Sequence, residues 1–482
     1  MPRVLMVASE AAPFIKTGGL ADVIASLPPE LNALGQEVAV LLPWYRESKV
    51  EESRCILEHV PIWLGKTSYL IRLHVSVVRG VPHYLVECPA LFDRKGVYVA
   101  PDGEFPDNHV RFAALARAAL VVARRLFRPH ILHCHDWQAA LVPVFLRGAL
   151  AGDPTFFGVR TLLTIHNLGY QGVFARWQLG EMGLDESVFH SGGVEFFGDV
   201  NLLRGGIASS DAISTVSKAY AKEIQTPEFG FRLDGLLRER ADALTGILNG
   251  VDYSVWNPET DRHIAANYSA ADLQGKRACK ADLLGQMRLP KEAMERPLVG
   301  IVSRFASQKG FDLLEEAAAD LVSQDLSLVA LGTGERRYEE LFLALAARYP
   351  ARIAVSVAYD DPLAHKIEAA SDIFLMPSRY EPCGLNQIYS LRYGTVPVVR
   401  ATGGLDDTID SSTGFKFKEY SAEALVAVLR TALAAYRNPE EWRRLMLNGM
   451  AKDYSWRNSA AQYATLYRRL APESSGRRPS SI

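Results

Sequence analysis

The chain has 482 residues, of which 48% are hydrophobic and 22% charged, and its formal net charge is −2. At roughly 100–200 residues per domain, this length predicts two or more domains of ordinary globular composition. The near-neutral charge argues against a nucleic-acid-binding protein, because such proteins usually carry a basic excess.

The cysteines and the apolar runs indicate the cellular compartment of the protein. None of the five cysteines forms a CxxC or CxxxC pair, which argues against a zinc site or a disulfide framework, and a reducing cytoplasm is expected. Residues 3–8 already read as a strand, so no signal peptide is expected. No apolar run approaches the roughly 20 residues of a membrane span, and no membrane partner is predicted.

The first half of the chain reads as repeated strand–loop–helix units. Strands are expected at Arg3–Ala8, Glu37–Leu42, Ile131–Cys134, Thr161–Ile165 and Ala212–Thr215, and helices at Leu20–Leu34 and Ala219–Ile224. Short apolar runs that alternate with helices indicate a parallel sheet covered on both faces.

The second half repeats this pattern. Strands are expected at Leu298–Val302, Ser327–Leu331, Ile353–Val357, Ile373–Met376 and Val396–Val399, with helices at Phe311–Leu321 and Leu363–Ala370 between them. The sequence therefore predicts a fold of the α/β class with two doubly wound domains. The C-terminal ends of their strands should line a cleft between the domains.

Lys16-Thr17-Gly18-Gly19-Leu20 follows the first strand and opens the first helix. The glycines would let a ligand approach the backbone, and Lys16 adds positive charge beside a helix N-terminus. The alternative is a Gly-Gly turn with a solvated lysine, and the spacing is not that of a P-loop. Asp22 suits the first turn of the helix.

Four polar residues follow two strands of the first half: His133, His135, Asp136 and His166. His133 and His135 alternate onto one face of a strand, so one interpretation is a metal site. The other is a set of polar groups that meet an organic ligand at two strand ends, and we favour it. Trp137 is expected to pack in the core.

Arg304 and Lys309 lie just after the first strand of the second half, where two cations five residues apart suit a diphosphate. Each charge-assisted bond in a closed site would contribute about 1.5–3 kcal/mol. As solvated surface charges, the two side chains would contribute almost nothing. Tyr359, after another strand, could equally stack on a base or pack as a core or rim tyrosine.

The segment Ser378–Leu385, SRYEPCGL, lies where a strand gives way to a helix. Glu381 can accept hydrogen bonds from sugar hydroxyls. The N–H groups of Gly384, Leu385 and Asn386 can face phosphate at the helix N-terminus. The alternative is a strand-to-helix turn with a capping acid.

Seven motifs in one order make the chain resemble the bacterial glycogen synthases and plant starch synthases, glycosyltransferase family 5. They are KTGGLADVI from Lys16, HCHDW from His133, TIHNLGYQG from Thr164, ILNGVD from Ile247, SRFASQKG from Ser303, SRYEPCGLNQIYSLRYGT from Ser378 and TGGLDDT from Thr402. The resemblance extends from residue 3 almost to the end of the chain.

The resemblance implies the GT-B architecture, two Rossmann-like doubly wound domains that face each other across a deep cleft. We place the first domain at residues 1–248 and the second at 249–456. The family fold implies that a helix at 457–473 crosses back to the first domain, and the Ser-, Arg- and Pro-rich segment 474–482 reads as a disordered tail.

The implied reaction is transfer of glucose from ADP-glucose to the non-reducing end of an α-1,4-glucan, with retained configuration and release of ADP. The implied partners are therefore ADP-glucose and glycogen or a malto-oligosaccharide. No metal and no pyridoxal phosphate is expected. Lysine, arginine and helix N-termini would supply the positive charge that a metal brings elsewhere.

The resemblance also assigns roles by position. Arg304 and Lys309 would neutralise the leaving diphosphate, and Glu381 would hold the glucose hydroxyls. The other assignments are His166, Asn167 and Asn249 beside the glucose, Tyr359 on the adenine, Lys16, Gly18, Gly19, Cys383, Gly384, Leu385 and Asn386 at the donor, and Asp136, Asp22 and Tyr98 on the sugar and acceptor side.

Several positions depart from the common family pattern: Gln138 replaces His, Asn386 replaces Thr and Arg204 replaces Lys. None of these changes removes a residue of the proposed catalytic set.

Three other functions compete with this assignment. A family 4 transferase that uses a UDP- or GDP-sugar usually has a second acid eight positions beyond the first, where this chain has Tyr389. A glycogen phosphorylase would carry pyridoxal phosphate on a lysine. A catalytically silent glucan-binding protein is disfavoured by the intact Lys16, Arg304, Lys309 and Glu381.

Overall fold

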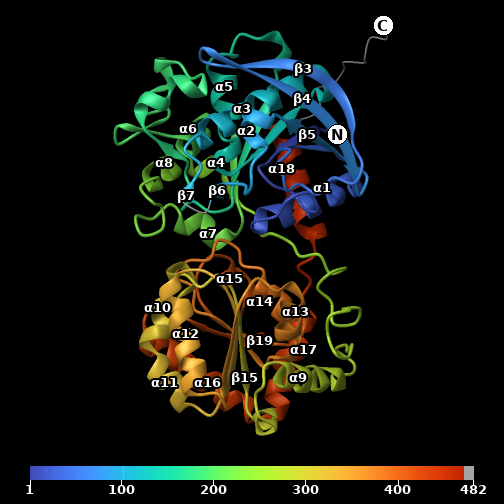
Figure 1. The fold of residues 1–482 in the computed structure, drawn as a ribbon, viewed down its shortest axis with the longest axis vertical. Helices are drawn as coiled ribbons and strands as arrows, with labels where there is room; N and C mark the ends of the chain where they lie inside the picture. The colour runs from blue at the N-terminus through green and yellow to red at the C-terminus, as the bar shows by residue number, and fades with distance from the viewer. Residues whose placement is uncertain (101–102, 472–482) are drawn as a thin grey trace. The chain divides into compact units, whose positions relative to one another are not determined.

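The computed structural model describes residues 1–100 and 103–471, and the chain divides into two compact units (Figure 1). The first unit comprises Met1–Val216, Ala221–Gly250 and residues 456–471. The second comprises Ser217–Tyr220 and Val251–Ser455. The tail predicted at 474–482 lies outside the described residues.

The four residues Ser217–Tyr220 belong to the second unit, although the chain on both sides of them belongs to the first. The sequence does not predict this. The Ser217 hydroxyl donates to the carbonyl of Pro382 at 2.7 Å. The backbone N–H groups of Lys218 and Ala219 donate to Asp407 Oδ2 at 2.6 and 2.9 Å. These bonds attach the tetrapeptide to the Pro382 loop and to the helix Gly403–Thr408 of the second unit.

The first unit is built on one large sheet, with strand order β14-β13-β9-β8-β1-β2-β5-β4-β3. Neighbours from β14 to β5 pair in parallel, as expected for the five buried apolar runs predicted from the sequence, while β5 and β14 are absent from the predicted strands. These strands are β1 (Arg3–Val7), β2 (Glu37–Pro43), β5 (Val81–Glu87), β8 (Ile131–His135), β9 (Arg160–Ile165), β13 (Ala212–Thr215) and β14 (Leu244–Gly246).

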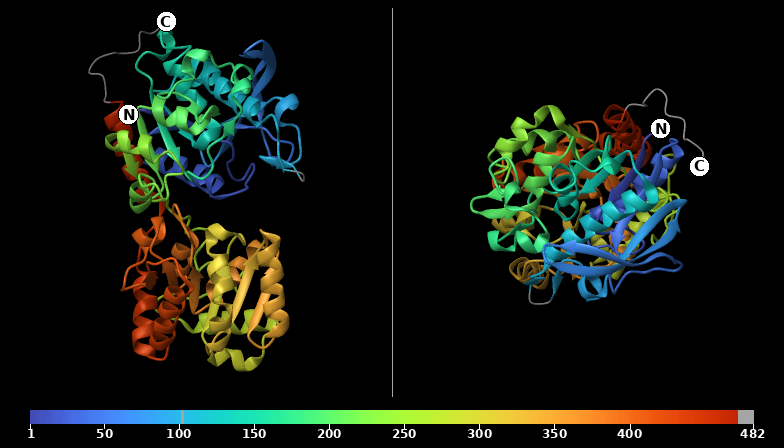
Figure 2. Two further views of the ribbon diagram at one scale, coloured as in Figure 1. Left: turned by 90° about the vertical axis from the view of Figure 1, so that its left-hand side faces the viewer. Right: turned by 90° about the horizontal axis from the view of Figure 1, so that it is seen from above.

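A long antiparallel hairpin extends this sheet beyond β5 (Figures 1 and 2). It consists of β3 (Arg54–Leu64) and β4 (Thr67–Val78). Trp63 and Leu70 are 59% and 61% exposed, so part of the hairpin faces solvent. Such strands lack a continuous apolar run, which is why the strand pattern of the core does not reveal them.

Helices cover the sheet of the first unit. They are α1 (Gly19–Ala33), α2 (Pro89–Phe92), α3 (Asn108–Val122), α4 (Asp136–Ala139), α5 (Leu141–Arg147), α6 (Leu202–Ser209), α7 (Lys218–Glu223, which begins in the second unit), α8 (Asp234–Glu239) and α18 (Trp456–Leu470). In Figure 1, α18 lies beside α1, and the two helices share a core in which Ile24 and Leu27 pack with Tyr463 and Tyr467.

The second unit has a parallel sheet with strand order β17-β16-β15-β18-β19-β20. Its strands are β15 (Leu298–Val302), β16 (Ser327–Gly332), β17 (Ile353–Val357), β18 (Ile373–Met376), β19 (Val396–Arg400) and β20 (Phe415–Phe417). β20 is absent from the strands predicted above.

Helices lie on both sides of this second sheet (Figure 1). They are α9 (Gln274–Gln286), α10 (Phe311–Glu316), α11 (Ala318–Ser323), α12 (Arg336–Arg348), α13 (Asp361–Ala370), α14 (Asn386–Arg392), α15 (Gly403–Thr408), α16 (Ala422–Tyr436) and α17 (Pro439–Met450). The single helix predicted at Phe311–Leu321 is wrong, because the chain breaks into α10 and α11 at Ala317, where ψ is −2°.

Within each unit, the parallel strands place their carboxyl ends at one edge of the sheet. The loops that carry the predicted site residues leave this edge, and each unit therefore presents its own half of the candidate set. No helix in residues 1–100 and 103–471 is both long and apolar enough to span a bilayer.

Candidate active site

In the second unit, Lys309 and Glu381 form a close ion pair. Lys309 follows β15 and Glu381 follows β18, and these two strands are neighbours in the sheet. Lys309 Nζ lies 2.6 Å from Glu381 Oε2, and the Ser378 hydroxyl donates to the same oxygen at 3.1 Å. Glu381 is only 5% exposed, so the pair is shielded from most of the solvent screening that weakens surface ion pairs.

The backbone of the Glu381 loop is held by the glycines at the start of α15. The N–H of Gly404 donates to the Glu381 carbonyl at 3.0 Å. A Cβ on Gly403 would lie 1.9 Å from that carbonyl oxygen, and a Cβ on Gly404 would lie 1.9 Å from the Cys383 carbonyl. Only glycine permits this approach, which explains the Gly-Gly pair of the TGGLDDT motif.

The other candidates of the second unit lie on neighbouring loops. Arg304 is exposed and donates to Gln308 Oε1 at 3.3 Å. The Asn386 side chain donates to the carbonyl of Val302 at 3.2 Å, which ties the start of α14 to the end of β15. Tyr359, after β17, is 82% exposed.

The backbone after Glu381 turns sharply into α14. Cys383 is 6% exposed. Gly384 has φ of +68°, a left-handed conformation that glycine adopts readily. Leu385 is the N-cap residue of α14. The N–H groups named in the sequence prediction therefore belong to a tight turn at a helix start.

In the first unit, the Lys16–Gly19 turn follows β1 and opens α1. Lys16 Nζ pairs with Asp22 Oδ1 at 2.8 Å. Gly18 and Gly19 have ordinary φ values, and a Cβ added at either would have no heavy atom within 4 Å. Neither backbone strain nor packing within the chain therefore requires glycine at these two positions.

A carboxylate that the sequence pattern did not reveal lies under this turn. Glu10 Oε2 accepts hydrogen bonds from the N–H groups of Thr17 at 2.5 Å and Gly18 at 3.3 Å. The Tyr98 hydroxyl donates to Glu10 Oε1 at 3.1 Å. Glu10 follows a predicted strand, as the other site acids do, and that position is the signal that could have identified it.

His166 and Asp136 meet at the ends of β8 and β9. The His166 N–H donates to Asp136 Oδ1 at 2.7 Å, and His166 Nε2 lies 2.9 Å from His135 Nδ1. Burial lowers the pKa of His166 to about 3, so its imidazole is neutral near pH 7. Burial also raises the pKa of Asp136 to about 7, against the opposing hydrogen bonds from the His166 and Asn167 N–H groups.

His133 is bonded to the protein through both ring nitrogens. Nδ1 lies 2.8 Å from the Tyr467 hydroxyl, and Nε2 lies 2.6 Å from Thr164 Oγ1. This leaves His133 no lone pair directed at a metal. In residues 1–100 and 103–471, no group of three or more His, Cys, Asp or Glu side chains is placed to hold one.

Three further residues named in the sequence analysis lie in the first unit: Trp137, Asn167 and Asn249. Trp137 is 8% exposed and packs edge-on against Phe112, as predicted. Asn167 accepts from the Gly169 N–H at 3.0 Å. Asn249 is 7% exposed, and its side-chain oxygen is buried without a hydrogen-bond partner among the described residues.

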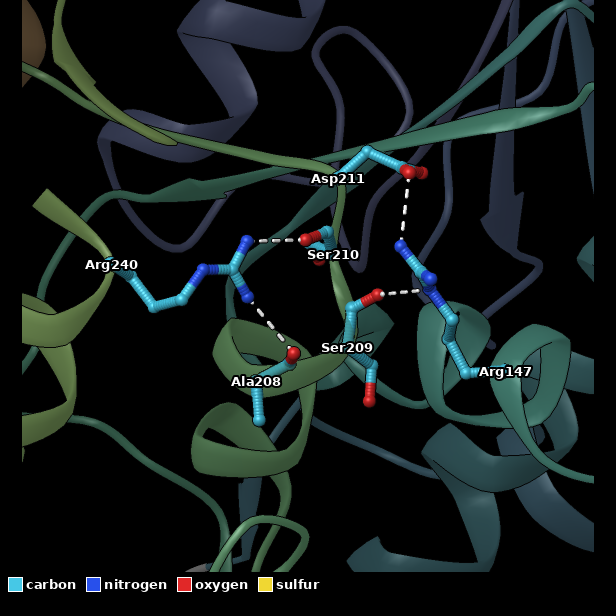
Figure 3. Close-up of a pocket in the computed structure, with 6 residues that line it drawn as sticks. All are labelled: Arg147, Ala208, Ser209, Ser210, Asp211 and Arg240. Atoms are coloured by element: carbon cyan, nitrogen blue, oxygen red, sulfur yellow. Dashed lines mark hydrogen bonds and ion pairs between the residues drawn. The ribbon is translucent and has the colours of Figure 1, made fainter. Parts of the chain in front are cut away.

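A pocket of about 350 Å³ in the first unit lies away from these residues (Figure 3). Its arginines, Arg147 and Arg240, donate to backbone carbonyls at the end of α6 and just after it. Asp211 in this pocket precedes β13, so the pocket is at the amino edge of the sheet. We interpret the two arginines as caps of the C-terminus of α6, because their guanidinium groups already bond to its last carbonyls.

Comparison with known proteins relates both halves of the chain to sugar transferases. Residues 3–239 match the family described as starch synthase catalytic domain, and residues 287–445 match glycosyl transferases group 1. A glycogen synthase of Koribacter versatilis is 49% identical over 473 residues, covering 96% of this chain and 97% of the relative. One from an Anaeromyxobacter species is 48% identical, covering 97% and 99%.

Solved structures agree with these matches. The catalytic domain of starch synthase IV from Arabidopsis thaliana, bound to ADP and acarbose, superposes with a TM-score of 0.89 at 33% identity, covering 98% of this chain and 99% of the other. Sucrose-phosphate synthase from Thermosynechococcus elongatus shares the fold alone, with a TM-score of 0.61 at 18% identity and coverage of 98% and 100%. The chain therefore belongs to the glycogen and starch synthase family of glycosyltransferases, and its fold is of the GT-B type.

Proposed function

We propose that this protein transfers glucose from ADP-glucose to the non-reducing end of an α-1,4-glucan, with retained configuration and release of ADP. The observation that carries the proposal is the partly buried Lys309–Glu381 pair, which joins a cation for phosphate to an acceptor for sugar hydroxyls. Support comes from the Arabidopsis relative, whose structure holds ADP and acarbose.

The chemistry follows from where charge develops. As the bond from the anomeric carbon to the diphosphate breaks, negative charge grows on the phosphate oxygens, and Lys309 and Arg304 would stabilise it. Glu381 Oε2 is engaged by Lys309 and Ser378, so we assign Oε1 to a glucose hydroxyl. Retention then proceeds by attack on the same face through an ion-pair-like state.

His166 has a different role from the cations. Because burial keeps its imidazole neutral, it would contact the glucose as a hydrogen-bonding group rather than as a charge. Its N–H bond to Asp136 fixes the backbone at the end of β9. We place both residues on the sugar side of the reaction.

We also propose that the reaction needs neither a metal nor pyridoxal phosphate. The support is the positive charge of Arg304 and Lys309 at the end of β15, which can serve the diphosphate directly. The cytoplasm is the compartment that we propose, because all five cysteines are free thiols.

The donor assignment predicts faster turnover with ADP-glucose than with UDP-glucose when glycogen is the acceptor. Initial rates with the two donors measure this. Tyr359→Ala should raise the KM for ADP-glucose if the exposed ring stacks on adenine, whereas Trp63→Ala, which removes an exposed aromatic from β3, should not. Equal or better turnover with UDP-glucose would contradict the donor assignment.

The same assay tests the cofactor proposal. Activity should survive EDTA, and the absorbance spectrum of the purified protein should lack a pyridoxal phosphate band. Loss of activity that Zn²⁺ or Mn²⁺ restores would instead favour a metal-dependent reaction.

Gly18→Ala should weaken binding of the ADP-glucose donor without lowering the stability of the fold. The added methyl has no neighbour within 4 Å, and the backbone is extended, so the melting temperature should stay near that of the wild type. The methyl would occupy space that we assign to the diphosphate, and the KM for ADP-glucose should rise about tenfold, a cost of about 1.4 kcal/mol. An unchanged KM would show that the open space serves no donor.

A further inference from the structure

Glu10 is a buried acid at the end of β1 whose hydrogen bonds all reach backbone or neutral hydroxyl groups. It is 3% exposed. Its carboxylate accepts from the Thr17 N–H at 2.5 Å, from the Thr17 hydroxyl at 2.9 and 3.1 Å, and from the Gly18 N–H at 3.3 Å. Charge-assisted bonds of this kind are stronger than neutral ones, so the turn is firmly attached to the residue below it.

The far side of the Glu10 carboxylate is also fixed. The Tyr98 hydroxyl bonds to Glu10 Oε1 at 3.1 Å and lies 2.7 Å from the Ser9 hydroxyl. The buried Tyr45 hydroxyl donates to the Ser9 carbonyl at 2.9 Å. Tyr98 thus holds the Glu10 carboxylate, and Tyr45 holds the backbone of the residue before it, so both parts of Glu10 are positioned by the first unit.

These bonds decide which face of the turn remains for a ligand. The N–H groups of Thr17 and Gly18 donate to Glu10. A diphosphate could accept from them only by displacing a buried carboxylate. The open face is the one formed by the Cα atoms of Gly18 and Gly19, where an added Cβ would meet nothing.

We propose that Glu10 is a positioning residue for the nucleotide-sugar donor. It holds the Lys16–Gly19 turn so that its glycine face is presented to the diphosphate, and it acts through the backbone without touching the substrate. This inference rests on the proposed function, because it takes the turn as part of the donor site.

Glu10 also links this turn to the sugar side of the first unit. Its negative charge adds to the burial that raises the pKa of Asp136. Tyr98, which we assign to the sugar and acceptor side, bonds to Glu10 directly. A single acid thus fixes the donor turn relative to neighbouring residues of the first unit.

The chain offers a matched control at the opposite edge of the same sheet. Asp211 Oδ2 accepts from the N–H of Thr161 at 2.8 Å and from its hydroxyl at 2.9 Å, the same pair of bonds that Glu10 makes with Thr17. Asp211 belongs to the pocket of Figure 3, away from the candidate site residues. Asp211→Ala therefore removes the same pair of bonds, together with the ion pairs of Asp211 to Arg147 and Arg160, without touching the donor turn.

The experiment compares Glu10→Ala, Glu10→Gln and Asp211→Ala with the wild type by initial rates and thermal unfolding. Glu10→Ala should raise the KM for ADP-glucose about tenfold or more and leave the KM for glycogen within about twofold. Glu10→Gln should recover much of this loss, because its amide oxygen can still accept from Thr17 and its NH₂ group can donate to Tyr98. Asp211→Ala should lower the melting temperature and leave both KM values within about twofold.

Three results would overturn the role of Glu10: an unchanged donor KM in Glu10→Ala, an equal rise in both KM values, or an equal rise in donor KM in Asp211→Ala. If Glu10→Ala does not fold, Thr17→Val decides, because it removes the hydroxyl bonds to Glu10 and keeps the acid itself. A donor KM that matches the wild type with a lowered melting temperature in that variant would mean a structural role only. Absence of wild-type turnover with ADP-glucose would instead refute the proposed function, so the two failures are distinguishable.

Discussion

Replacing Lys309 by alanine is expected to lower kcat by two to three orders of magnitude, about 3–4 kcal/mol of transition-state stabilisation, with little change in the KM for glycogen. The ammonium group would be lost where the leaving diphosphate gains charge. Its removal would also leave Glu381, 5% exposed, without the partner that lies 2.6 Å away. The unpaired carboxylate would then repel the diphosphate. Arg304→Ala should act in the same direction.

Lys416→Ala is the control for the Lys309 experiment. Lys416 Nζ pairs with Asp406 Oδ1 at 2.6 Å in the same unit, so its loss also breaks a short lysine–carboxylate bond. It should leave kcat near the wild-type value. A Lys309→Ala protein with wild-type kcat would refute the assigned role, and a loss confined to the KM for glycogen would place Lys309 on the acceptor.

Gly403→Ala is expected to destabilise the second unit by several kcal/mol and to reduce activity severely. Gly403 has φ of +47°, and a Cβ there would lie 1.9 Å from the Glu381 carbonyl oxygen. The left-handed conformation alone costs a non-glycine residue about 1–2 kcal/mol. Relief of the clash would also displace the loop that carries Glu381. Calorimetry and initial rates should show a lowered melting temperature and a lowered kcat.

Gly285→Ala is the comparison for Gly403→Ala. Gly285 lies within α9, where an added Cβ would meet nothing within 4 Å. Alanine is the better helix former by about 1 kcal/mol, so this variant should be as stable as the wild type or more stable. If Gly403→Ala melted and turned over like the wild type, the close approach to Glu381 would not constrain the site.

The parallel strands and the junctions that follow them could be predicted from the sequence. Runs such as Leu298–Val302 are buried on both faces, so they stay apolar throughout and stand out from their surroundings. Because the carboxyl ends of parallel strands share an edge of the sheet, the placement of Lys309 and Glu381 at one edge also follows from the sequence. These predictions needed only local pattern and the rules of parallel sheets.

Other features depend on contacts that no local pattern encodes. The hairpin β3–β4 has a solvated face, so its residues resemble those of a loop as much as those of a strand. The attachment of Glu10 to the Thr17 N–H depends on how the chain folds back after β1. The bonds from Ser217 to Pro382 and from Lys218 to Asp407 join residues far apart in the sequence.

The placement of Ser217–Tyr220 in the second unit affects how relatives of this protein can be recombined. A segment exchange that begins at Val251 would bring in a new Asp407 and a new Pro382 loop but would keep the old tetrapeptide. The imported carboxylate would then have to accept from N–H groups that evolved against another surface. A chimera that carries Ser217–Tyr220 together with Val251–Ser455 would preserve these bonds, so the exchangeable module is discontinuous in sequence.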